Sequence, residues 1–166
     1  MRKLSHFEDL VDFLSVILAY APDEFPYRDY HKEQGQSVWE LGWSKRGYTI
    51  EAMIANGRGL DPMFETIDIF KDGHDTSIKS MNLNAPSYQN AGRVEWMLRR
   101  YVDKVSAFDG GRGGLDEVLR GQTSQRSLIV VIPNQGTVIQ REVFRNVQRY
   151  GAGLDAPVDV EFRVYP

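Results

Sequence analysis

The stretch IDIFKDGHDTSIKSMNLN, residues 67–84, decides the fold that we expect for this chain. Two segments rich in β-branched residues flank the turn-like sequence Lys71-Asp72-Gly73. A glycine-containing turn between two such segments is typical of a β-hairpin. We therefore predict paired strands over Thr66–Phe70 and Thr76–Leu83.

The predicted hairpin carries an acid on one strand and an amine on the other. Asp68 interrupts an apolar run, and Lys79 follows Ser77 by two residues. Alternate residues of a strand point to one face, so Ser77 and Lys79 share a face and Asp68 could project toward the same spot. Either charge would cost free energy if it were buried alone. The pattern therefore predicts that Asp68 and Lys79 meet.

Glu51 adds a second carboxylate, on a short helix that we predict just before the hairpin. Two carboxylates with a hydroxyl and an ammonium nearby have the composition of a divalent-metal site, because hard cations prefer carboxylate oxygen. The alternative is a structural ion pair between Asp68 and Lys79, with Glu51 merely exposed. The residues alone leave both interpretations open.

Periodicity along the rest of the chain predicts helices and strands that alternate. Helical spacing covers Phe7–Tyr20, Tyr48–Ala55, Tyr88–Phe108 and Val138–Tyr150, and strand patterns cover Ser127–Ile132 and Val158–Val164. Helices placed between strands imply crossover connections. The chain is therefore expected to form an α/β domain with a mixed sheet that helices cover on both faces.

Three connecting segments carry weaker signals. Val38–Trp43 suggests a short helix or the start of the next one, and Asn56-Gly57 is a good helix C-cap. The run Gly110–Gly114 lacks the Lys-Ser/Thr of a phosphate-cradling loop and is interpreted as a flexible break, followed by one or two helical turns at Leu115–Leu119.

Composition and charge set broader limits. The chain has 166 residues, 42% apolar and 26% charged, as expected for one globular domain, and no stretch resembles a signal peptide or a membrane span. It has no cysteine, which excludes disulfides and thiolate zinc sites. Residues 1–70 hold 12 acids and 7 bases, whereas residues 86–150 hold 10 bases and 6 acids. The basic half suits a phosphate-rich partner, although solvated helix faces often carry arginine as well.

Two segments resemble a known family. GYTIEAMIANGRG (47–59) and FETIDIFKDGHDTSIKSMNLNAPSYQN (64–90) are similar to the nuclease toxin domain at the C-terminus of contact-dependent growth inhibition (CDI) proteins, in the PD-(D/E)xK superfamily. The likeness covers roughly residues 45–166. It implies a restriction-endonuclease-like mixed sheet flanked by helices over residues 37–166, with a helical N-terminal segment over residues 1–36.

The resemblance also implies roles for the four residues around the hairpin. Glu51 and Asp68 match metal-binding acids, and Lys79 matches the lysine that orients the attacking water and offsets charge on the phosphate. Ser77 stands where the superfamily motif has its second acid, although a serine resembles the toxin subfamily. With fewer charged ligands, we expect one divalent ion (Mg²⁺, Mn²⁺ or Zn²⁺). Asn82 stands where an aspartate would be expected.

Candidate substrate contacts lie further along the chain. By resemblance, Gln140 occupies a polar position near the substrate; the alternative is an ordinary glutamine on a helix surface. Tyr88 follows the hairpin and is expected to pack over its strands. Arg93 belongs to the basic half that would grip the phosphate backbone. His74 could transfer protons or could be an exposed histidine in the hairpin turn.

The function implied by the resemblance is a metal-dependent nuclease toxin that hydrolyses phosphodiester bonds in competing bacteria. Transfer RNA is the expected substrate on family grounds, and DNA is the alternative. Such a toxin is delivered into the cytoplasm of the target cell and is paired with a cognate immunity protein. Two rival interpretations are a nuclease-like module that binds without cutting and, given an isoelectric point near 5.6, an acidic immunity-type protein.

Overall fold

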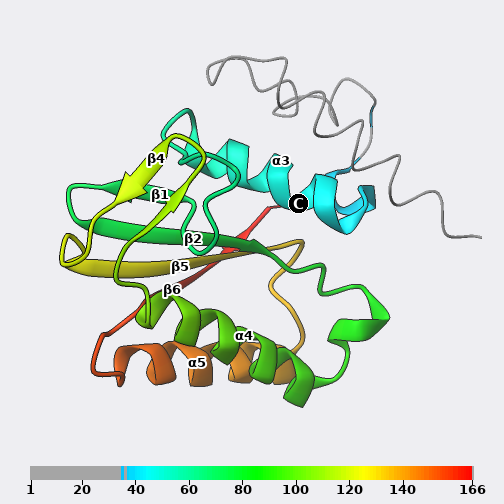
Figure 1. Ribbon diagram of the computed structural model, residues 1–166. Coiled ribbons are helices and arrows are strands. Elements are labelled where there is room, and N and C mark those ends of the chain that lie inside the picture. The colour runs from blue at the N-terminus through cyan, green and yellow to red at the C-terminus, as the bar shows by residue number, and fades with distance from the viewer. Residues whose placement is uncertain (1–34, 36, 166) are drawn as a thin grey trace, which may run out of the picture.

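The computed structural model describes Gly35 and residues 37–165 (Figure 1). The helix predicted over Phe7–Tyr20 and nearly all of the predicted N-terminal segment therefore lie outside the described residues. In chain order the elements are the 3₁₀-helix η1 (Val38–Glu40), α3 (Trp43–Ala55), β1 (Ile69–Lys71), β2 (His74–Ser80), the 3₁₀-helix η2 (Pro86–Tyr88), α4 (Ala91–Ser106), β3 (Gly111–Gly113), β4 (Asp116–Val118), β5 (Gln125–Ile132), α5 (Val138–Ala152) and β6 (Asp159–Val164).

A four-stranded sheet in the order β1-β2-β5-β6 forms the centre of the described domain. Strand β1 runs antiparallel to β2, whereas β2, β5 and β6 are mutually parallel. Helix α3 covers one face, and α4 and α5 cover the other (Figure 1). This arrangement confirms the predicted mixed α/β sheet with helices on both faces.

Strand β5 explains why the apolar run near residue 130 is continuous rather than alternating. Leu128 and Val130 pack into the core beneath α4 and α5, whereas Ile129 and Val131 pack beneath α3. A central parallel strand buried on both faces needs apolar residues at every position. Each fully buried side chain of this size contributes roughly 1.5–3 kcal/mol.

The hairpin has the predicted turn but shifted strands. Asp72 and Gly73 have positive φ angles of 51° and 79°, and the cross-strand register pairs Lys71 with His74. Two successive positive φ angles are the mark of the tight hairpin turn that matches strand twist. His74, predicted in the turn, instead begins β2, where its Nε2 lies 2.7 Å from Ser127 Oγ. Its placement as an exposed turn histidine is therefore wrong.

Helix boundaries follow their caps. Helix α3 begins at Trp43, five residues before the predicted start, and ends as predicted at Asn56, which is left-handed at φ 49°. Asn90 caps α4 by accepting a hydrogen bond from the Arg93 backbone N–H at 2.9 Å. Thr137 caps α5 in the same way, within a capping box.

The break and helical turns predicted over residues 110–119 are wrong, because this segment forms a second hairpin of β3 and β4. Gly113 packs directly on the backbone of Phe64, where no side chain would fit. Val118 is buried with Phe64 and Phe108. Gly113 therefore serves close packing, and Val118 is the one apolar residue of β4.

Candidate active site

Asp68 stands where β1 and β2 part. Its backbone N–H donates to Thr76 O at 2.8 Å, but the chain before it turns away from β2. At this edge of β2 the Asp68 carboxylate takes the place of a paired strand. Its Oδ2 accepts hydrogen bonds from the Ile78 backbone N–H and, at 3.3 Å, from Ser77 Oγ. A backbone donor left without a partner in a half-buried place would be costly. Capping by Asp68 thus fixes the carboxylate at the sheet edge.

Lys79 completes the contact. Its Nζ lies 3.4 Å from Asp68 Oδ2 and donates to Ile78 O at 2.8 Å, and the side chains of Lys79 and Asp68 are 30% and 18% exposed. The predicted meeting of Asp68 and Lys79 is therefore confirmed. All three hydrogen bonds to this carboxylate use Oδ2, so no described residue engages Oδ1.

Glu51 approaches the same point from α3. Burial and the charge of Asp68 raise the pKa of Glu51, and Lys79 lowers it, with a net rise to about 7. Tyr48 lies one helical turn earlier, and burial together with Glu51 raises the pKa of that phenol. Glu51 is half-buried, so the exposed Glu51 of the alternative interpretation is wrong, whereas its ion pair between Asp68 and Lys79 is present. The fold holds two carboxylates together against their repulsion.

The donor atoms at this point suit a hard divalent cation. Glu51, the unengaged Asp68 Oδ1, the Ser77 hydroxyl and the Ile78 carbonyl are all oxygen donors. Within the described residues, no three His, Cys, Asp or Glu side chains gather in one place. The residues present therefore fit one ion held by two carboxylates.

Arg46 is a neighbour that the sequence analysis missed. Its Nε lies 3.5 Å from Ser80 Oγ, and its guanidinium stacks 5.9 Å from the centre of the Trp39 ring. Burial lowers the pKa of Arg46, and no described carboxylate pairs with it. In the sequence, Arg46 was indicated by its position alone, five residues before Glu51 on the same helix. A partly desolvated cation beside the strand of Lys79 suits a phosphate.

The predicted substrate contacts are placed differently from one another. Gln140 is only 5% exposed, so the helix-surface alternative is wrong. Its Oε1 accepts from the Thr137 backbone N–H at 2.8 Å, and its Nε2 donates to Tyr88 O at 3.0 Å. Gln140 thus ties the start of α5 to the segment after the hairpin. Its role near a substrate stays a prediction.

Tyr88 and Arg93 lie on either side of the start of α4. Tyr88 is half-buried against the core and interacts electrostatically with both Arg46 and Tyr101. Arg93 is exposed, and the described contacts do not bring it to Asp68 or its neighbours. Asn82 serves local structure, because its Oδ1 accepts from the Asn84 backbone N–H and its Nδ2 donates to Trp39 O.

Comparisons with known proteins agree with this architecture. The structure resembles that of a CdiA-CT/CdiI toxin and immunity complex from Yersinia pseudotuberculosis, with a TM-score of 0.60 and 18% sequence identity over 76% of this chain and 100% of that chain. At this identity the match establishes the fold. No curated protein matches the chain. The model of the CDI toxin restriction endonuclease-like domain matches residues 46–164, and the chain therefore belongs to that family.

Proposed function

We propose that this member of the CDI toxin family is a metal-dependent nuclease that hydrolyses phosphodiester bonds with Glu51, Asp68, Ser77 and Lys79. The observation that carries the proposal is the convergence of two carboxylates from different elements beside one ammonium. Burial, together with the charge of Asp68, raises the pKa of Glu51 to about 7. Such an arrangement costs stability unless a cation balances it, and perturbed carboxyls of this kind gather at functional sites.

Glu51 and Asp68 Oδ1 would hold the cation. When bound, a divalent ion makes water more easily deprotonated and polarises a phosphoryl oxygen. Ser77 and the Ile78 N–H keep the Asp68 carboxylate in one orientation through Oδ2. Lys79, anchored on the Ile78 carbonyl, would place its ammonium against the negative charge that develops on the phosphate.

The substrate is nucleic acid in this proposal, with transfer RNA expected from the family resemblance and DNA as the alternative. Water is the nucleophile, so none of the four residues requires a 2′-hydroxyl. Helices α4 and α5 add a basic layer of seven cations, Arg93, Arg99, Arg100, Lys104, Arg141, Arg145 and Arg149, against three acids, Glu95, Asp103 and Glu142. This excess of charge favours binding to phosphates.

A cognate immunity protein is the second proposed partner. The structural neighbour is itself described as a toxin and immunity complex. We expect an acidic protein that covers the Asp68–Lys79 site or the basic layer, because charge complementarity speeds the encounter. Membership in a toxin family is at odds with the immunity-type interpretation of this chain.

Delivery into the cytoplasm of a target cell completes the proposal. Among the described residues, no helix is both long enough and apolar enough to cross a membrane.

The test is cleavage of total transfer RNA and, separately, of plasmid DNA. Each is incubated with wild type, with Asp68→Ala and with Asp155→Ala, in Mg²⁺, Mn²⁺ or Zn²⁺ and in chelator. Asp155 is an exposed carboxylate in the loop between α5 and β6. We expect cleavage by wild type and Asp155→Ala only, and only with metal. Cleavage that survives chelation would contradict the metal mechanism. Intact substrates in every reaction would favour the module that binds without cutting.

The same variants test toxicity. Expression of wild type and Asp155→Ala in a bacterium should arrest growth, and expression of Asp68→Ala should not. Growth that is equally normal with all three would contradict the toxin proposal.

A further inference from the structure

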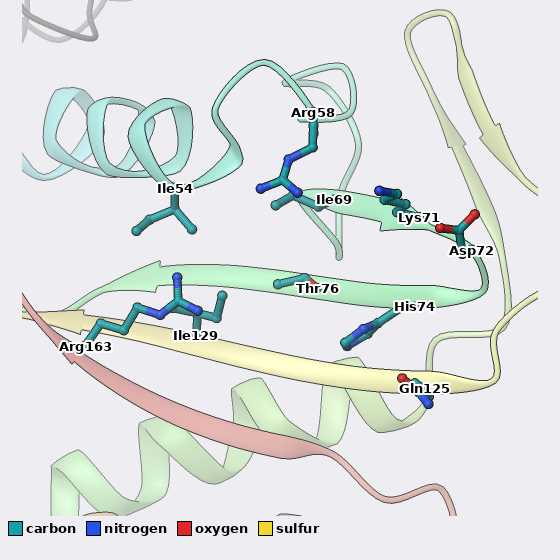
Figure 2. Close-up of a pocket in the computed structure, with 10 residues that line it drawn as sticks. All are labelled: Ile54, Arg58, Ile69, Lys71, Asp72, His74, Thr76, Gln125, Ile129 and Arg163. Atoms are coloured by element: carbon teal, nitrogen blue, oxygen red, sulfur yellow. The ribbon is translucent and has the colours of Figure 1, made fainter.

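A groove of about 410 Å³ opens on the face of the sheet that carries α3 (Figure 2). It crosses all four strands of the sheet. The residues around it come from the end of α3 and from β1, β2, β5 and β6, and include Ile54, Arg58, Ile69, Lys71, Thr76 and Arg163. None of the four proposed catalytic residues lines it.

Strand register gives the groove its length. Lys71 is level with His74 at one end. Arg163 pairs with Val131, which pairs with Ser80, at the other end. His74 and Ser80 are six residues apart on β2, which corresponds to about 20 Å of strand. The groove is therefore long enough for a short extended polymer rather than for a single small ion.

The rims of the groove are cationic. Figure 2 shows Arg58 and Lys71 on the β1 side and Arg163 reaching in from β6. Arg163 is already paired with Glu161 at 2.6 and 2.7 Å. Arg58 and Lys71 form no ion pair with any described residue, and the one described hydrogen bond of the Arg58 side chain runs from Nε to Ala55 O. Two cations are thus left for a ligand, with Asp72 as the one acid in the lining.

The floor of the groove is partly apolar. Ile69 and Ile129 contribute to it; Thr76 pairs with Ile69 across β1 and β2, whereas Ile129 pairs with Ile78. A lining of polar and apolar side chains bordered by cations without an ion-pair partner suits a nucleic-acid strand, because the phosphates can contact the cations while the sugars and bases lie over the lining.

The groove adjoins the proposed catalytic site. Ile69, the first residue of β1, directly follows Asp68 in the chain. Ile54 follows Glu51 by three residues on one side of α3, and Arg58 stands in the loop that follows the helix end at Asn56. A nucleic-acid strand whose reacting phosphate lies at the sheet edge could continue into the groove.

We propose that this groove binds the single strand next to the scissile phosphate, with Arg58 and Lys71 each contacting one phosphate. The proposal rests on the nuclease function proposed above and adds the path of the substrate. It predicts two phosphate contacts that act on binding and not on the chemical step.

The test is binding rather than cleavage, measured in the Asp68→Ala background. A dye-labelled single strand of about ten nucleotides, in DNA and RNA form, is titrated with Arg58→Ala, Lys71→Ala and both together, by fluorescence anisotropy across a salt series. Each lost phosphate contact should lower the slope of log K against log salt by about 0.7 and weaken binding about fivefold at 0.1 M salt. The double variant should lose about 25-fold.

Two controls separate a groove from general charge. Lys45→Ala with Arg120→Ala removes one exposed lysine and one exposed arginine elsewhere and should leave the slope unchanged. Arg58→Lys with Lys71→Arg should keep it as well. Circular dichroism and the urea midpoint of the double alanine variant should match the parent, since both side chains are exposed.

The possible outcomes distinguish failure of the groove proposal from failure of the nuclease proposal. An unchanged slope in the double alanine variant overturns the groove, even if wild type cleaves nucleic acid. A reduced slope without any wild-type cleavage supports the groove and contradicts the nuclease. Loss of affinity for a cognate acidic protein, with oligonucleotide binding intact, would mark a protein-binding face and overturn the proposal.

Discussion

Replacing Glu51 by glutamine should stabilise the protein at pH 8 and change little near pH 4.5. Burial and the charge of Asp68 raise the pKa of Glu51 from 4.5 to about 7. Between these values the folded protein holds a proton that the unfolded chain has released. Wild-type stability therefore falls as the pH rises through this window, whereas glutamine does not titrate.

The size of this stability difference follows from the pKa shift of Glu51. A difference of one pKa unit corresponds to 1.36 kcal/mol, so the rise of Glu51 from 4.5 to about 7 is worth about 3 kcal/mol above pH 7. Urea unfolding of both proteins from pH 4.5 to 8 measures it. The quantity of interest is the difference between the variants, because other groups titrate equally in both. A difference that stays flat across this range would refute the reasoning.

The same curves test the cation. A divalent ion that binds only the folded state stabilises it by mass action, so millimolar Mn²⁺ should raise wild-type stability at pH 8. Glu51→Gln removes one of two carboxylates and should lose most of this gain. Equal stabilisation of both proteins would place the cation elsewhere.

Two further substitutions test other parts of the structure. Lys79→Met should lower the cleavage rate at saturating metal by roughly 10²–10³-fold, because it removes a preorganised cation from the developing charge, and a rate within twofold of wild type would exclude that role. Gly113→Ala should destabilise the fold by about 1–3 kcal/mol in urea, because its new methyl group would meet the Phe64 backbone. Gly92→Ala, whose methyl group would have room beside Asn90 Oδ1 at 3.5 Å, is the matched control and should not destabilise.

Local chemistry made much of the fold predictable. The Lys71-Asp72-Gly73 turn and the left-handed cap at Asn56 follow from residues that tolerate positive φ. The continuous apolar run of β5 follows from burial on both faces. In each of these places the deciding interaction lies within a few residues of the signal.

The errors arise where distant residues decide. Gly113 signals flexibility on its own, and only contact with Phe64 shows that it is a packing position. Gln140 has the pattern of an exposed helix residue, yet its amide is engaged by Thr137 on one side and by Tyr88 on the other. Arg46 carries no local motif at all. Its proximity to Ser80 comes from the way α3 crosses β2.

Ser77 decides how much charge the proposed site can balance. Its side chain is almost fully buried and donates to Asp68, so an acid in its place would add a third negative charge to Glu51 and Asp68. With serine, two carboxylates and Lys79 sum to one negative charge when all are ionised. One divalent ion would turn this into one positive charge, which matches the single charge of a phosphodiester. A second ion would leave an excess that no described carboxylate at this point offsets, and the proposed mechanism therefore uses one.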